Sequence, residues 1–279
     1  MGRASRIIGY PQKPLTMQKL YVIKIGGNVL DNQVALAAFL KDFASIQYPK
    51  ILVHGGGKTA TTIGKRMGIE ANYANGRRIT DGPTRDLVTM VYGGLINKQI
   101  VATLQSWQCN ALGLTGADGN ALKATKRPVG EIDFGLVGDV ASKDVNTSLL
   151  YFLLKQNIIP VFAPLTYSHE HGMLNTNADT IASAVAVALS KHFHIRIIYC
   201  FEKKGVLKNI ENEKSVMKAI DSKAYGELVA QKALMDGILP KLENAFEALQ
   251  NGVGEILIGS AADLVKNMGD EPEGTLIRK

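Results

Sequence analysis

Short apolar runs that end in glycine alternate along this chain with segments patterned for helices, and this alternation restricts the possible folds more than any other feature. Residues 20–25 run directly into Gly26-Gly27, and residues 50–54 run into Gly55-Gly56-Gly57. A short apolar run rich in β-branched residues is typical of a strand that is buried on both faces. Strands separated by helices form a parallel sheet with helices on both faces. We therefore expect an α/β protein.

The rest of the chain continues the same alternation. Further strands are expected at residues 111–114, 158–162, 195–200 and 255–258, and helices at residues 33–45, 58–67, 84–105, 143–156 and 179–190. Glycines and prolines interrupt residues 122–140, which indicates a β-hairpin. No apolar run reaches the ~18–20 residues that a membrane span needs, so we expect a soluble protein without a membrane partner.

Charge and cysteine content favour a cytoplasmic protein that acts on anionic small molecules. The formal net charge is +7, and five basic residues but no acidic one precede Asp31. This charge suits anionic substrates, whereas a nucleic-acid-binding protein needs a denser basic patch than the sequence contains. Cys109 and Cys200 are far apart in apolar stretches, so we expect two buried thiols in a reducing compartment. Residues 1–16 lack the apolar core of a signal peptide, and we expect a mobile extension there.

The two glycine turns are the first candidate functional segments. Successive glycines let backbone N–H groups approach an anion, and a helix N-terminus favours a carboxylate or a phosphate. Lys24 precedes the first turn, where it could bind an anion or simply reach solvent. Neither the Rossmann nor the Walker glycine spacing is present. His54 precedes the second turn and is expected to be a packed histidine rather than a catalytic base.

Two polar segments could hold a substrate. Arg77 and Arg78 follow an Asn-Gly turn, and alternation in an extended segment should direct at most one of them to a site. Asn175, Asn177 and Asp179 alternate just before an apolar helix. They could cap that helix, or they could share one side of the chain, where the acid could orient lysines.

Lys241 is a third candidate, in the segment Asp236-Gly237-Ile238-Leu239-Pro240-Lys241. Proline suits the first turn of a helix, so Lys241 should lie near a helix start. A cation is disfavoured there by the helix dipole, which favours an anionic partner for this lysine.

Five motifs in order make the sequence resemble the amino acid kinase family. They are Lys-x-Gly-Gly from Lys24, His-Gly-Gly-Gly from His54, Asn-Gly-x-Arg-x-Thr from Asn75, Leu-x-Asn-x-Asn-Ala-Asp from Leu174 and Asp-Gly-x-x-x-Lys from Asp236. Each motif is weak alone, but their order and spacing are specific, and the resemblance runs from about residue 19 to residue 278.

This resemblance implies a three-layer αβα sandwich with a mainly parallel central sheet, usually as a homodimer. Residues 17–175 would form an N-lobe that binds an acyl-amino acid and dimerises, and residues 176–279 would form a C-lobe that binds ATP. The implied reaction is ATP-dependent phosphorylation of the γ-carboxylate of N-acetyl-L-glutamate to N-acetylglutamyl 5-phosphate, in arginine biosynthesis. Mg²⁺ would be bound mainly through the phosphates.

The resemblance also assigns roles to individual residues. Two lysines would stabilise the transferring phosphoryl group and an aspartate would hold them in place: Lys24, Lys241 and Asp179. The acyl-amino acid would contact Gly56, Gly57, Arg78 and Asn175. The nucleotide would contact Gly26, Gly27, Glu202, Gly205, Val206 and Leu207. Such a site needs no general base, since a carboxylate is already ionised and the main task is to neutralise two opposing anions.

Two positions depart from the family pattern and leave alternatives open. Glu202-Lys203-Lys204 stands where relatives commonly have Asp-Val-Ser or Asp-Val-Asp, which bears on nucleotide choice. Tyr73 stands where many relatives have lysine, which bears on recognition of the acyl group. The alternatives are an N-succinylglutamate kinase, another amino acid kinase and a non-catalytic amino-acid sensor on the same fold. Nucleic-acid binding is a distant further alternative.

Overall fold

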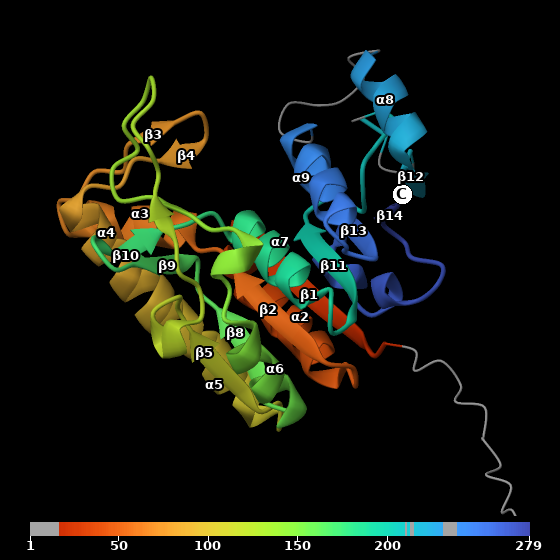
Figure 1. Ribbon diagram of the computed structural model, residues 1–279, viewed down its shortest axis with the longest axis horizontal. Coiled ribbons are helices and arrows are strands. Elements are labelled where there is room, and N and C mark those ends of the chain that lie inside the picture. Colours follow the sequence, from red (N-terminus) through yellow and green to blue (C-terminus); the bar gives the residue numbers. More distant parts are fainter. Residues whose placement is uncertain (1–16, 210, 213–214, 231–238) are drawn as a thin grey trace, which may run out of the picture.

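The central sheet confirms the expected α/β class. The computed structural model describes residues 17–209, 211–212, 215–230 and 239–279, so the predicted extension at residues 1–16 lies outside the described residues. The sheet has eight strands in the order β12-β14-β13-β11-β1-β2-β8-β5 (Figure 1). Their bounds are β1 Lys19–Ile25, β2 Lys50–His54, β5 Ala111–Leu114, β8 Ile159–Phe162, β11 His194–Phe201, β12 Ala219–Ile220, β13 Glu255–Ser260 and β14 Thr275–Ile277. Within this sheet only β13 and β14 pair antiparallel.

Helices cover both faces of the sheet and make it the middle layer of three (Figure 1). Their bounds are α1 Gly27–Asp31, α2 Gln33–Ser45, α3 Gly57–Arg66, α4 Gly82–Val88, α5 Asn97–Ser106, α6 Thr147–Lys155, α7 Ala178–Leu189, α8 Ser222–Ala230 and α9 Leu239–Gln250. Alternate residues of β1 pack into different cores: Leu20 and Val22 contact the cluster with α6, α7 and α9, whereas Tyr21 and Ile23 contact the cluster with α2, α4 and α5. The αβα sandwich is therefore confirmed.

Three small hairpins lie outside the central sheet. The expected hairpin at residues 122–140 is confirmed by β6 (Thr125–Lys126), which pairs with β7 (Gly138–Asp139). The sequence analysis did not predict the pairs β3 (Tyr73–Ala74) with β4 (Arg77–Arg78) and β9 (Leu165–Ser168) with β10 (Gly172–Asn175). Strands of two to four residues are too short to show a hydrophobic period, and tertiary contacts fix them instead.

The helix expected at residues 84–105 is continuous but irregular. A π-helical segment, Thr89–Ile96, joins α4 to α5. The helical stretch Gly82–Ser106 is long and apolar enough to cross a membrane by length and composition, contrary to the expectation that no segment is. One side of it, including Leu87, Val91, Ile100 and Leu104, packs into the core between the helices and the sheet. It is therefore placed as a core helix of a globular fold.

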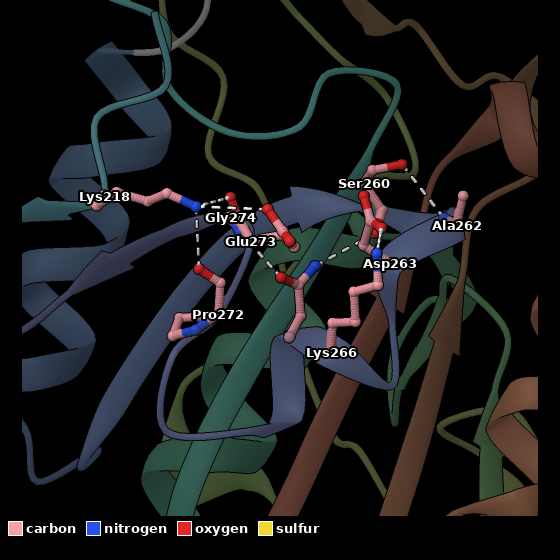
Figure 2. Close-up of polar contacts among 9 residues, drawn as sticks. Lys218, Ser260, Ala262, Asp263, Lys266, Pro272, Glu273 and Gly274 are labelled. Carbon is pink, nitrogen blue, oxygen red and sulfur yellow. Dashed lines mark hydrogen bonds and ion pairs between the residues drawn. The ribbon is translucent and has the colours of Figure 1, made fainter. Parts of the chain in front are cut away.

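The return strand β14 is fixed by polar contacts at the corner after β13 (Figure 2). Asn267 receives a hydrogen bond from the Gly274 amide (2.9 Å) and donates one to the Ser260 carbonyl (3.4 Å). Lys218 Nζ donates to the Glu273 carbonyl (3.1 Å). These contacts hold Thr275, whose hydroxyl accepts from the Val206 amide (2.8 Å). The corner thereby positions Val206, which the sequence analysis assigned to nucleotide binding.

His54 is packed, as expected. It is fully buried at the end of β2; Nδ1 donates to the Gly55 carbonyl (2.7 Å) and Nε2 accepts from the Asn97 amide (3.2 Å). Burial lowers the pKa of His54 to about 4. The ring is therefore neutral at pH 7.

Cys109 and Cys200 are both buried and unpaired, which confirms the expectation of two buried thiols.

Acidification should destabilise the protein through His54. Its pKa is about 4 in the folded chain and 6.5 as its ordinary value, so the unfolded state binds more protons between these pH values. The free energy of unfolding should fall by about 2 kcal/mol more in the wild type than in His54→Gln between pH 7 and pH 4.5. Urea titrations at the two pH values measure this difference. Equal losses in both proteins would contradict the role of His54.

Candidate active site

The two glycine turns lie side by side because β1 and β2 are parallel neighbours that end at the same edge of the sheet. Gly26 caps α1 and Gly56 caps α3. The Gly55 amide donates to the Ile25 carbonyl (3.1 Å), which fastens the second turn to the end of the first strand. Backbone N–H groups from both turns therefore gather at one place, as an anion site requires.

Gly56 is required at its position for two independent reasons. Its φ is +152°, a conformation that residues with a side chain rarely adopt. A Cβ would also lie 2.6 Å from Ile96 Cδ1 and 2.9 Å from Tyr92 Cδ1, on the π-helical segment. Gly57 has open space around it and begins the ten-residue helix α3, so its side of the turn remains accessible.

A cavity of about 550 Å³ lies over the first glycine turn. Its lining contains all the residues that the sequence analysis assigned to ATP: Gly26, Gly27, Glu202, Gly205, Val206 and Leu207. Lys24 and Lys241 border the same cavity. A side chain at Gly205 would collide with Thr275 and Val216, so this turn approaches β14 as closely as its backbone allows.

The three residues assigned to catalysis come from three different elements. Lys24 in β1 forms an ion pair with Asp179 in the first turn of α7 (2.8 Å). Asn177 caps that helix by accepting from the Asp179 and Thr180 amides, so the predicted capping role is confirmed. An acid in the first turn is stabilised by the helix dipole. Asp179 is thereby held beside Lys24.

Lys241 is positioned differently from Lys24. Its ammonium lies 3.6 Å from the centre of the Phe201 ring, a cation–π contact. Among the described residues no ion pair joins it to Asp179, although Asp179 affects it electrostatically. Burial lowers the pKa of Lys241 and the nearby Lys24 lowers it further, while Asp179 acts in the opposite direction. The preceding residues 236–238 of its motif lie outside the described residues.

A second cavity, of about 220 Å³, adjoins the first at Gly57, which lines both. Its lining contains every residue assigned to the acyl-amino acid: Gly56, Gly57, Arg78 and Asn175. The predicted site residues other than Asp179 therefore line two neighbouring cavities that share Gly57.

Arg78 is buried and firmly held in the second cavity. Its Nη2 donates to the Gly57 carbonyl (2.9 Å), to Thr61 Oγ1 (2.7 Å) and to Tyr73 Oη (2.6 Å). Its Nη1 is buried without a hydrogen-bond partner among the described residues. A buried donor of this kind needs an acceptor, and a planar guanidinium suits a carboxylate. Arg77 is exposed, as strand alternation predicts, although it also borders the cavity.

Asn175 offers this cavity a hydrogen-bond acceptor, whereas Arg78 offers a donor. Its Nδ2 donates to Thr80 Oγ1 (3.0 Å), which leaves its carbonyl oxygen to accept a hydrogen bond.

The sequence analysis missed two basic residues of the cavities. Lys58 lines the first cavity and donates a hydrogen bond to the Asn28 side chain. Arg127 lines the second cavity. Lys58 directly follows the glycine run and could have been proposed from that position, whereas Arg127 belongs to no motif.

Metal binding by protein side chains alone is not supported by the described part of the chain. No group of three His, Cys, Asp or Glu side chains there is clustered closely enough to hold an ion. Glu202 is the acidic residue in the lining of the first cavity. A hard divalent cation at this site would therefore depend largely on oxygen ligands from a phosphate or from water.

Comparison with known proteins identifies relatives over nearly the whole chain. The amino acid kinase family profile matches residues 19–260. The acetylglutamate kinase of Cytophaga hutchinsonii is 55% identical, over 90% of this chain and 94% of the relative. The acetylglutamate kinase of Parabacteroides distasonis is 50% identical, over 91% of this chain and 98% of the relative. The crystal structure of smu.665 from Streptococcus mutans is 29% identical, with a TM-score of 0.74 over 93% of this chain and 98% of that one.

The lowered pKa of Lys241 predicts an early loss of activity at alkaline pH. The ammonium should lose its proton below the 10.5 of an ordinary lysine, so phosphate binding should weaken as pH rises through that range. The measurement is kcat/KM for ATP against pH, which reports groups in the free enzyme. Lys241→Arg keeps its charge and should shift the decline to higher pH. Coincident profiles would show that another group causes the decline.

Proposed function

The chain belongs to the amino acid kinase family, and on that premise we propose that it transfers the γ-phosphoryl group of ATP to the γ-carboxylate of N-acetyl-L-glutamate, in arginine biosynthesis. One observation carries the proposal for the site: the predicted nucleotide residues and the predicted acyl-amino acid residues line two cavities that meet at Gly57. A phosphoryl donor and a carboxylate acceptor bound in these cavities would face each other across that glycine.

In the second cavity the acyl-amino acid would be held at both of its polar ends. The unpartnered Nη1 of Arg78 would bind the α-carboxylate, and the Asn175 carbonyl would accept the acylamino N–H. The γ-carboxylate would then lie against the amides of Gly56 and Gly57 at the start of α3. Binding at two fixed ends orients the reacting carboxylate toward the first cavity.

In the first cavity the chain would neutralise charge rather than transfer protons. The attacking carboxylate and the triphosphate are both anions, so the barrier is largely electrostatic and positional. Lys24 and Lys241 line this cavity, where the Gly26-Gly27 turn can cradle the γ-phosphate. Asp179 keeps Lys24 in place, and Phe201 supports Lys241. The carboxylate nucleophile is already ionised, so the neutral His54 has no proton to remove.

We also propose that Mg²⁺ accompanies ATP and is held mainly by phosphate oxygens and water, with Glu202 as the acidic side chain in the lining. When bound, such an ion would neutralise phosphate charge.

The enzyme would be a cytoplasmic homodimer. Leu112 on the edge strand β5, and Met90 and Leu95 on the π-helical segment, are exposed apolar side chains, and exposed apolar side chains support an interface with a second copy.

Removal of either lysine should abolish most of the activity. Lys24→Ala or Lys241→Ala deletes a cation that faces the transferring phosphoryl group, and the expected loss in kcat is at least ~10²-fold. The assay measures ADP and hydroxylamine-trapped acyl phosphate with ATP, Mg²⁺ and N-acetyl-L-glutamate. Lys19→Ala is the matched control, since Lys19 begins the same strand, is exposed and lines neither cavity. Unchanged turnover in the Lys24 and Lys241 variants would refute the mechanism, and an inactive wild type would favour a sensor.

Replacement of Arg78 should affect one substrate only. Arg78→Gln removes the planar cation from the second cavity, so KM for N-acetyl-L-glutamate should rise by about 10-fold or more. KM for ATP should change much less, because Arg78 does not line the first cavity. Steady-state kinetics with each substrate varied in turn measure both constants. A parallel rise in the two would mean that the cavities do not bind separate substrates.

A further inference from the structure

Arg127 is a second arginine of the acyl-amino acid cavity, with 19% of its side chain exposed, and the family resemblance assigns it no role. Its Nε and Nη2 donate to one carboxylate oxygen of Asp139 at 3.0 and 2.6 Å, and its guanidinium lies 5.4 Å from the centre of the Phe134 ring. Two contacts therefore fix the plane of the guanidinium. Its Nη1, like that of Arg78, is buried without a hydrogen-bond partner among the described residues. Arg127 is thus pre-positioned, and its Nη1 still lacks an acceptor among the described residues.

The charged side chains that line this cavity are all positive. It contains Arg77, Arg78 and Arg127, and none of the residues that form it is acidic. Asp139 balances Arg127 only from outside that lining. N-acetyl-L-glutamate has a single carboxylate apart from the one that reacts, and Arg78 would take it. A further carboxylate on the substrate would give Arg127 Nη1 an acceptor.

The position of Arg127 indicates which part of the substrate it would meet. The Arg127 amide donates to the Val137 carbonyl (2.8 Å), and Val137 is bridged in turn to Asn175. Val137 also lines the cavity. Arg127 therefore lies beside the residue that would bind the acylamino group, on a different element from the glycine turn that would receive the γ-carboxylate. In the proposed binding mode, the acyl group is the part of the substrate that would extend to this side.

We propose that Arg127 is a specificity-determining residue that binds a carboxylate at the far end of the N-acyl group, so that the enzyme prefers a dicarboxylic acyl group such as succinyl to acetyl. This inference rests on the proposed kinase function: it keeps the γ-carboxylate of an N-acylglutamate as the phosphoryl acceptor and changes only the preferred acyl group. The acyl carboxylate would accept from the unpartnered Nη1, while Asp139 and Phe134 keep the guanidinium in place. Arg78 and Asn175 would hold the glutamate part in the same way for either acyl group.

Three substrates with the same glutamate part test the proposal. They are N-acetyl-L-glutamate, N-succinyl-L-glutamate and the neutral amide of the second, N-(3-carbamoylpropanoyl)-L-glutamate, which has the same shape without the charge. The kcat/KM of the wild type should be at least ~10-fold higher for the succinyl compound than for its amide or for the acetyl compound, because a site built for a polar group rejects analogues that lack it. Equal values for the succinyl compound and its amide, or a preference for acetyl, would overturn the proposal.

Substitutions assign the preference to one residue. Arg127→Gln should lower the succinyl-to-amide ratio of kcat/KM by about 10-fold or more, and Arg127→Lys should retain part of it because it keeps the charge. Lys126→Gln is the matched control: it removes the neighbouring cation at the end of β6, which lines neither cavity, and it should leave the ratio unchanged. Equal losses for all three substrates in Arg127→Gln would assign it a structural role instead. Absence of ADP formation by the wild type with every compound would refute the proposed function itself.

Discussion

The parallel pairing of β1 with β2 is the constraint on which the rest of the site depends. Both strands end at one edge of the sheet, and the hydrogen bond from the Gly55 amide to the Ile25 carbonyl brings their glycine turns together. Gly56 can form its turn only without a side chain, because Ile96 and Tyr92 occupy the space that a Cβ would need. The π-helical segment that supplies these two residues therefore shapes the turn between the cavities, although it lies far from both strands in the sequence.

The two cavities differ in the kind of cation that lines them and in how each cation is held. In the first, the cations differ in their support: Lys24 is neutralised in part by Asp179, whereas Lys241 rests on an aromatic face and has a lowered pKa. A phosphoryl group that develops charge between them would meet Lys24, which an ion pair holds in place, and Lys241, whose protonated form an incoming anion would stabilise. In the second cavity the cations are arginines, whose rigid, always-charged guanidinium groups suit carboxylates that bind but do not react.

The sequence predicted the parts of this arrangement that depend on local patterns. Buried strands such as β2 carry a continuous apolar run, and Asn177 precedes its helix as capping residues do, so both could be predicted from a few residues. The π-helical segment and the two-residue strands β3 and β4 could not, since neighbours distant in the sequence determine them. The pairing of Lys24 with Asp179 was anticipated by resemblance, whereas the ring of Phe201 beneath Lys241 required the three-dimensional arrangement. Arg127 was missed because a single arginine in a hairpin has no pattern.

One departure from the family pattern, Tyr73, bears on how the second cavity holds its arginines. Tyr73 stands where many family members have lysine, and here its hydroxyl accepts from Arg78 while its ring lies 4.9 Å from the Arg78 guanidinium. Tyrosine therefore fixes Arg78 without adding charge on that side of the cavity. Arg127 supplies a cation from another element, the β6–β7 hairpin. Hairpins tolerate sequence change better than the glycine turns at the sheet edge. If the proposed roles hold, substrate choice can therefore change in the hairpin while the residues at the glycine turns keep the reaction the same.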